Sequence, residues 1–414
     1  TGCLVRLREG IMRRLEYLLG WLVVTALVTG CTTTQVNRLE DQVAAEKAQQ
    51  DIPTAQLLNV NIAEFDPNIP PAEERADQTI PVVPAVREAE AGYFAYNLRT
   101  TLESTGHWGA VRVVPETQES AELGVEGTIL QSDGQTLELK IRAEDATGRV
   151  WIDDKTYSRR ASAATYNSRN APEEPFQSLY NDIANDLLAR RQQLADEDLV
   201  TRRQVSKLRF AADLLPEAFD PYLEENRGRY RLVGLPAEND PMMDRIEAIK
   251  YRDNLLIDSL DQYYHNFHQN MEPAYDQWRA SSYEEMAQLR KLKRQANTRK
   301  IFGGLGALAS VVALANSESR TQSAASQAAL FGSVQTIRAG ISKGKDTEIH
   351  EATLEELNTS LGGDLEPRVM NLEGKTVTLQ GSAKEQYREW QELLGNLHQI
   401  EIGAGEDNLP DREF

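Results

Sequence analysis

Apolar and polar positions alternate in short stretches through the first half of the chain, which is typical of strands with one buried face. The strands predicted in this way are residues 57–65, 110–114, 123–130, 135–143 and 149–157. Apolar residues at helical spacing predict helices at residues 87–104 and 176–194. The order β-α-β-β-β-α over residues 56–196 therefore predicts an α+β domain with helices against one face of a sheet.

Residues 197–345 show helical spacing of apolar positions and are predicted to be mainly helical. Asp240-Pro241 suits a helix start, and Pro273 is expected to kink or restart the long helix that follows. A Gly/Ala-rich stretch then predicts an apolar helical hairpin over residues 301–341. Gly303 and Ala307, like Gly306 and Ser310, are small residues four apart, which let helix backbones approach closely.

Three interpretations of the 301–341 hairpin stay open. It could be buried within the chain, it could be a surface for self-association, or it could insert into a membrane. The apolar run 301–315 is shorter than the roughly 20 residues that cross a bilayer, although basic residues flank the hairpin.

The end of the chain predicts a small α/β module at residues 346–402, with the order helix, strand, strand, helix, short strand, and then a flexible tail at 403–414. The run Val377-Thr378-Leu379-Gln380-Gly381, the helix 384–397 and Ile400-Glu401-Ile402 together are similar to a BON domain. This resemblance implies an association with envelope and phospholipid surfaces.

The N-terminal α+β domain resembles the periplasmic domain shared by CsgG-type secretion lipoproteins, LpoB-type synthase activators and the TolB N-terminal domain. Three runs carry this resemblance: Ile62-Ala63-Glu64-Phe65, Val111-Arg112-Val113-Val114, and residues 122–129. It implies a non-enzymatic component of the cell envelope.

Residues 1–30 are predicted to comprise upstream residues and a signal peptide, because Met12-Arg13-Arg14 precedes a short apolar run that ends in small residues. The run Val28-Thr29-Gly30-Cys31 resembles the lipobox of bacterial lipoproteins. The resemblance implies cleavage before Cys31, which would carry diacylglycerol on its sulfur and an N-acyl chain. Thr32 in the next position implies sorting to the outer membrane. The alternative is an uncleaved anchor or an internal apolar helix.

Residues 31–55 are predicted to be the acylated cysteine and its tether. The 45 Lys and Arg against 64 Asp and Glu give a net charge of −19. Removing residues 1–30, with four Arg and two Glu, changes this to −19 − 2 = −21. An acidic surface argues against nucleic-acid binding. It should also be repelled from anionic lipid, which leaves the acyl chains as the expected attachment.

One helix face gathers the side chains most suited to a metal, namely Asp261, His265, His268 and Glu272. The stripe is about 16 Å long at 1.5 Å per residue, so the four cannot share one ion without ligands from elsewhere. The alternative is the solvated polar side of an amphipathic helix, and we expect no metal and no non-covalent cofactor. The only cysteines, Cys3 and Cys31, exclude a cysteine metal site in the body of the chain.

Signatures of nucleophilic, metalloprotease and phosphate-loop enzymes fail on inspection, so we expect no enzymatic activity; a hydrolase with an unrecognised site is the remaining possibility. The first positions to consider for partner contact are Trp108, Trp151 and Trp390, together with Gly303, Gly306 and Ala307. The alternative is that each tryptophan packs in a core.

The sequence thus predicts an outer-membrane lipoprotein that faces the periplasm and acts as a docking, assembly or accessory factor for an unidentified envelope protein. The alternative is a homo-oligomeric ring or pore built around the 301–341 hairpin.

Overall fold

The computed structural model divides the chain into two units, Thr1–Glu40 and Asp41–Phe414. It describes residues 42–75, 82–162, 165–166, 174–311, 355–356, 359, 365, 367–372 and 375–396, all in the second unit. The signal peptide, Cys31, residues 312–345, the predicted strand 400–402 and the tail lie outside these residues. The described part mixes helices and strands, so the α+β class is confirmed.

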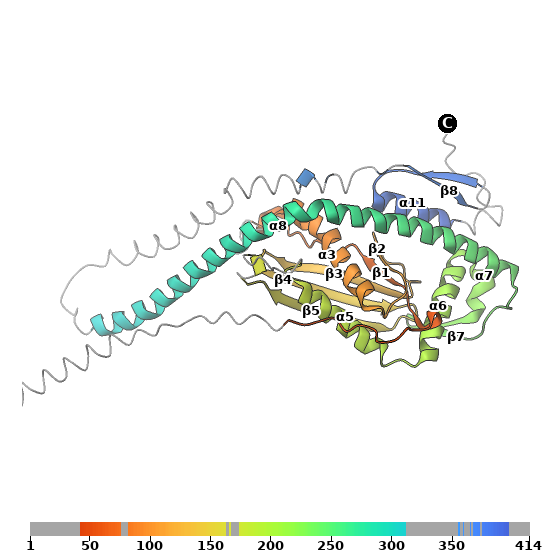
Figure 1. Ribbon diagram of the computed structural model, residues 1–414, viewed down its shortest axis with the longest axis horizontal. Helices are drawn as coiled ribbons and strands as arrows, with labels where there is room; N and C mark the ends of the chain where they lie inside the picture. Colours follow the sequence, from red (N-terminus) through yellow and green to blue (C-terminus); the bar gives the residue numbers. More distant parts are fainter. Residues whose placement is uncertain are drawn as a thin grey trace, which may run out of the picture. The chain divides into compact units, whose positions relative to one another are not determined.

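A five-stranded mixed sheet forms the centre of the described unit (Figure 1). Its strands are β1 (Val60–Ala63), β2 (Val111–Val114), β3 (Leu123–Ser132), β4 (Thr136–Asp145) and β5 (Val150–Arg160), in the order β2-β1-β3-β4-β5. Strand β1 is parallel to both β2 and β3, and the remaining pairs are antiparallel. All five predicted strands are present, although the first covers only the middle of the predicted range.

Two helices, α3 (Pro84–Thr105) and α5 (Gln177–Arg191), cover one face of this sheet and confirm both predicted helices. Their side chains pack with those that alternate along β3 and β4 on the same face, such as Val125, Ile129, Leu139 and Ile141. The intervening positions are charged and partly or fully exposed, such as Glu126, Lys140, Arg142 and Glu144. This period of two places the helices against one face, as predicted.

Residues 42–50, which fall in the predicted tether, bind along α5. The side chain of Asn181 donates to the Val43 carbonyl (2.8 Å), and that of Asn185 donates to the Ala44 carbonyl (2.9 Å). The amide of Ala48 donates to the Thr105 carbonyl at the end of α3 (2.8 Å). This part of the chain is therefore fixed to the domain. The short elements η1 (Thr54–Gln56) and α2 (Ala72–Arg75) lie on either side of β1.

The region after α5 contains α6 (Asp196–Leu214), α7 (Pro216–Phe219), η2 (Asp220–Tyr222) and the hairpin of β6 (Leu223–Asn226) and β7 (Arg229–Leu232). The hairpin was not predicted, because its two four-residue strands are mostly exposed and polar. Its turn packs on the β4–β5 turn: Tyr230 donates its amide to the Thr147 carbonyl (3.0 Å). A Cβ on Gly148 would lie 1.9 Å from the Gly228 carbonyl oxygen.

Helix α8 (Pro241–Val311) is 71 residues long, about 105 Å at 1.5 Å per residue. It runs through Pro273 without restarting. The hydrogen bond lost at Pro273 is offset by packing on both sides of it, since Met271, Tyr275 and Trp278 are buried. Its middle lies against α3 and the edge of β2, which it covers (Figure 1).

The C-terminal part contains β8 (Arg368–Leu372), β9 (Lys375–Leu379) and α11 (Ala383–Gly395), close to the predicted strands and helix. Two hydrophobic cores result. The first joins the sheet, α3 and α5 to Tyr264, Phe267, Met271, Tyr275 and Trp278 of α8. The second joins α6 and the first turns of α8 to α11. Helix α8 therefore contributes to both cores, so the cores extend across the predicted domain limits at residues 196 and 345.

Candidate functional site

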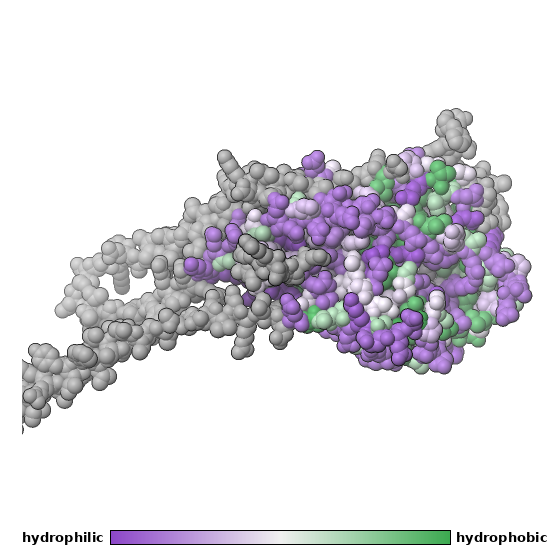
Figure 2. Space-filling view, in the orientation of Figure 1, coloured by the Kyte–Doolittle hydropathy of each residue, from purple (hydrophilic) through white to green (hydrophobic). Residues whose placement is uncertain are grey.

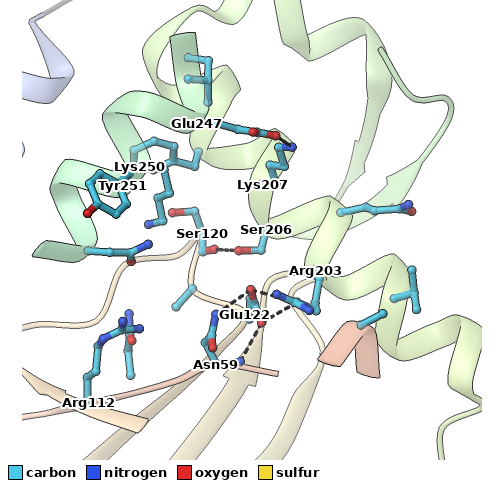
Figure 3. A pocket seen from close by; sticks show the side chains of 18 residues that line it. Asn59, Arg112, Ser120, Glu122, Arg203, Ser206, Lys207, Glu247, Lys250 and Tyr251 are labelled. Atoms are coloured by element: carbon cyan, nitrogen blue, oxygen red, sulfur yellow. Dashed lines mark hydrogen bonds and ion pairs between the residues drawn. The ribbon is translucent and has the colours of Figure 1, made fainter. Parts of the chain in front are cut away.

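A pocket of about 490 Å³ lies where α6, the start of α8 and the edge of the sheet converge (Figure 3). Asn61 of β1 and Arg112 of β2 are paired in register and both line it. Because side chains alternate along a strand, these two point away from the face that α3 and α5 cover. The pocket volume is within the range typical of ligand sites.

The wall on the α6 side is held by Glu122. Its carboxylate accepts hydrogen bonds from the Asn59 amide (2.7 Å) and the Asn59 side chain (3.1 Å), and forms an ion pair with Arg203 (3.4 Å). Arg203 also donates to the Thr54 carbonyl (2.6 Å). Ser206 of α6 donates to the Ser120 carbonyl (2.5 Å), so the loop before β3 is fixed to the helix.

The opposite wall is formed by α8, from which Lys250 and Asn254 line the pocket one turn apart. Asp258, one turn further along and outside the lining, continues the same row. Asp258 binds Arg112 Nε at 2.5 Å, and Lys250 binds Asp253 at 2.9 Å. The Lys250 ammonium also lies 4.2 Å from the centre of the Phe210 ring. A further ion pair, Lys207–Glu247, joins α6 directly to α8.

The remaining lining residues include the apolar side chains of Ala121, Val200 and Ile246 and the amide side chain of Gln204. Tyr251, which also lines the pocket, is 64% exposed. In Figure 2 the visible described surface is mostly hydrophilic, with small groups of hydrophobic residues scattered among hydrophilic ones. The pocket therefore combines charged, amide and apolar side chains.

The candidate metal ligands on α8 bind separate partners on α3 and β2. Asp261 accepts from the Val113 amide (2.9 Å) and pairs with Arg99 (3.0 Å). His265 Nδ1 lies 2.5 Å from the Tyr96 hydroxyl, and His268 Nε2 lies 3.1 Å from Asn97 Oδ1. Glu272 also has an interaction partner. In the described part of the chain no three of His, Cys, Asp and Glu are grouped to hold a metal ion. This face of α8 therefore forms a polar contact with α3. Neither the metal site nor its alternative, a solvated helix face, predicted this contact.

Beside this stripe lies a buried ionic network. Arg279 of α8 is fully buried and binds both carboxylate oxygens of Glu174 (3.0 and 2.9 Å). On α3, Glu90 accepts from Tyr275 (2.6 Å), pairs with Arg87 (3.1 Å) and accepts from Ser132 of β3 (2.5 Å). Burial raises the pKa of the Glu90 carboxyl, and Arg87 opposes this. The network joins α8 to the sheet domain and was not predicted from the sequence.

His268 makes the contact between α8 and α3 sensitive to acid. Its ring stacks on Tyr93 (4.3 Å between centroids), and burial, with Arg279 and His265 nearby, lowers its pKa to about 4. Because the unfolded state binds the proton more tightly, this residue lowers stability as the pH falls from about 6.5 to 4.

Through the titration of His268, the free energy of unfolding is expected to fall by about 2 kcal/mol between pH 7 and pH 5. Denaturation of the unmodified protein and of His268→Gln at both pH values isolates it, because the variant lacks this titration. The unmodified protein should lose more stability than the variant on acidification. Equal losses would contradict the lowered pKa.

The three tryptophans proposed for partner contact are buried. The ring centroids of Trp108 and Trp151 lie 6.2 Å apart in the first core. The Trp151 indole N–H donates to the Asp145 carboxylate (2.7 Å). Trp390 is 0% exposed and donates to Asp253 (3.2 Å) in the second. The structure therefore supports the alternative of core packing. Gly303, Gly306 and Ala307 fall in the last turns of α8, where the backbone alone is described, so the hairpin interpretations stay open.

The pocket itself was missed by the sequence analysis, because its lining comes from residues between 55 and 254 that only the fold brings together. The available signal was the i, i+4 spacing of Lys250 and Asn254 on a predicted helix. No helix in the described residues is both long and apolar enough to span a membrane. No protein-family model, no curated protein and no solved structure matches this chain.

Proposed function

We propose that this protein is a lipid-anchored docking or accessory factor on the periplasmic side of the outer membrane, with no enzymatic activity of its own. The observation that carries the docking role is the pocket between α6 and α8. Its walls are held by ion pairs between separate elements, Arg112–Asp258 and Lys207–Glu247 among them. A preformed site of this kind loses little freedom when a partner binds.

The lipobox at Val28-Thr29-Gly30-Cys31 supports the anchor. Residues 42–50 are fixed to α5, so the ten residues 32–41 connect the proposed acylated cysteine to the domain. Ten residues can span at most about 35 Å. An anchor this close to the domain would raise the effective concentration of the pocket for partners in the same membrane.

Replacing Cys31 with Ser is expected to move the protein from the membrane fraction to the soluble periplasmic fraction. The reason is that the acyl chains are lost and a body with a net charge of −21 gains no attraction from anionic lipid. Fractionation followed by a wash in high salt measures this. A Cys31→Ser protein that still sediments with the outer membrane would contradict the lipid anchor.

The docking role is tested by chemical cross-linking in cells, affinity purification of the lipidated protein and quantitative mass spectrometry. We expect one other envelope protein at near-equal stoichiometry, at a level that falls in the Cys31→Ser variant. A large uniform ladder of this chain alone would instead support the ring or pore and overturn the docking role.

A further inference from the structure

The tether and the C-terminal end of α8 leave the sheet domain from the same end. Val43 is bound at the first turn of α5, where its amide donates to Ser178 Oγ (3.3 Å). Glu174, three residues before α5, binds Arg279 of α8. The chain before Val43 therefore departs near the Glu174–Arg279 pair, whereas the pocket lies near the start of α8, around residues 246–254.

Helix α8 continues well past this end of the domain. Arg290 is still in contact with the sheet domain, because it pairs with Asp133 (3.4 Å) at the β3–β4 turn. Up to Val311 the helix extends about 32 Å beyond Arg290, at 1.5 Å per residue. In Figure 1 this part of α8, drawn in cyan, runs away from the sheet.

The sequence divides this extension into two zones. Residues 291–300, here called the basic collar, contain five cations and no Asp or Glu: Lys291, Lys293, Arg294, Arg299 and Lys300. Residues 301–311, here called the apolar tip, contain only apolar and small residues. The tip is about 16 Å long, which is half of the roughly 30 Å hydrocarbon core of a bilayer. Its length therefore suits a single leaflet.

The tether matches the extension in length. The ten residues 32–41 span at most about 35 Å. From Arg279, near which the tether departs, α8 runs about 33 Å to Ile301. The membrane that holds the proposed acylated Cys31 is therefore within reach of the apolar tip.

The charge of the extension is opposite to that of the whole chain, which carries −19. Ile301 lies about 16 Å beyond Arg290, which is more than the Debye length of about 8 Å at physiological salt. The negative charge of the body is therefore largely screened at the apolar tip, whereas the basic collar adjoins it. Cations next to an apolar stretch are typical of segments that bind anionic phospholipid.

We infer that the end of α8 contacts the membrane that holds Cys31, with the apolar tip in the acyl chains of one leaflet and the basic collar at anionic headgroups. The inference rests on the lipid anchor of the proposed function and adds a second membrane contact. This contact limits how the domain turns about its tether, so the pocket is held at a defined distance from the membrane. A single interfacial contact binds weakly, so the protein without its acyl chains is still released.

The test uses the lipidated full chain in vesicles of phosphatidylethanolamine and phosphatidylglycerol. Leu305→Cys accepts the fluorophore NBD at that position alone, because Cys31 is acylated and Cys3 lies before the cleavage site. We expect a blue-shifted emission and quenching by lipids with a nitroxide on the acyl chain, at least about threefold stronger than for NBD on Arg231→Cys. Arg231 is the matched control, because it is 74% exposed on β7 and does not line the pocket.

The basic collar is tested with a variant in which Lys293, Arg294, Arg299 and Lys300 are replaced by Gln. Quenching at position 305 should fall at least about twofold in this variant, and likewise in vesicles of phosphatidylcholine alone, because the attraction to anionic headgroups is lost. Circular dichroism of each variant verifies folding. Quenching that is equal with and without these cations would contradict the role of the collar.

NBD at position 305 that keeps a water-like emission in vesicles would overturn the inference. So would a blue shift without quenching by the nitroxide lipids, because the apolar tip would then be covered by protein. If Cys31→Ser nevertheless releases the protein from membranes in cells, the lipid anchor stands and the second contact alone fails. If mass spectrometry finds no acyl chain on Cys31, the lipid anchor fails and the second contact fails with it.

Discussion

Replacing Arg279 with methionine is expected to lower the free energy of unfolding by about 3–5 kcal/mol, which is the usual cost of removing one partner from a buried ion pair. Arg279 is fully buried, and its loss leaves the Glu174 carboxylate without its cation. The guanidinium also lies 4.7 Å from the centre of the Tyr275 ring and 5.6 Å from that of Tyr93. Urea denaturation followed by tryptophan fluorescence measures the change.

Arg388→Met is the matched control, because Arg388 on α11 is 70% exposed and pairs only at 3.8 Å with Glu392. Exposed pairs of this kind contribute at most about 1 kcal/mol. If Arg279→Met cost no more than Arg388→Met, the buried network would not be what holds α8 to the sheet domain.

The second large effect is expected for Trp390→Ala, at about 3–5 kcal/mol, because removing a fully buried tryptophan leaves a cavity. The substitution also deprives Asp253 of the indole N–H donor. Denaturation gives the total loss, and hydrogen exchange should show that α11 loses protection first, since Trp390 is its largest buried side chain.

Val369→Ala serves as the control for Trp390→Ala, because Val369 on β8 in the same module is 67% exposed and should cost less than about 0.5 kcal/mol. A Trp390→Ala protein of unchanged stability that no longer recovers its partner would restore the interpretation of Trp390 as a contact residue.

The elements of the sheet domain could be predicted because the sheet is buried on one side, so that burial imposes a period of two. Strand β3 shows this directly: Leu123, Val125 and Ile129 are 0% exposed, and Glu126 between them is exposed. The β6–β7 hairpin gave no such signal, since its strands are mostly exposed, with Leu223 and Leu232 only partly buried against the second core. Its turn in addition packs on the turn at Gly148.

The polar stripe of α8 shows why side-chain roles were harder to predict than elements. His265 and His268 share a helix face, as their spacing indicates, but spacing cannot show that Tyr96 and Asn97 of α3 occupy that face. The same limit applies to Arg279, whose place in a helix rich in charged residues resembles that of a solvated side chain. Long-range packing decides both, and it produces the pocket from segments up to about 200 residues apart.

The central claim is that a partner docks at the pocket between α6 and α8. It is tested most directly by placing a photo-reactive amino acid at Tyr251 in the lipidated protein in cells, with the same substitution at Arg231 as control. We expect one cross-linked hetero-product from position 251, none from position 231, and loss of the product when Arg112→Gln is added. Products of equal yield from both positions, or a product from position 251 that persists with Arg112→Gln, would contradict the claim.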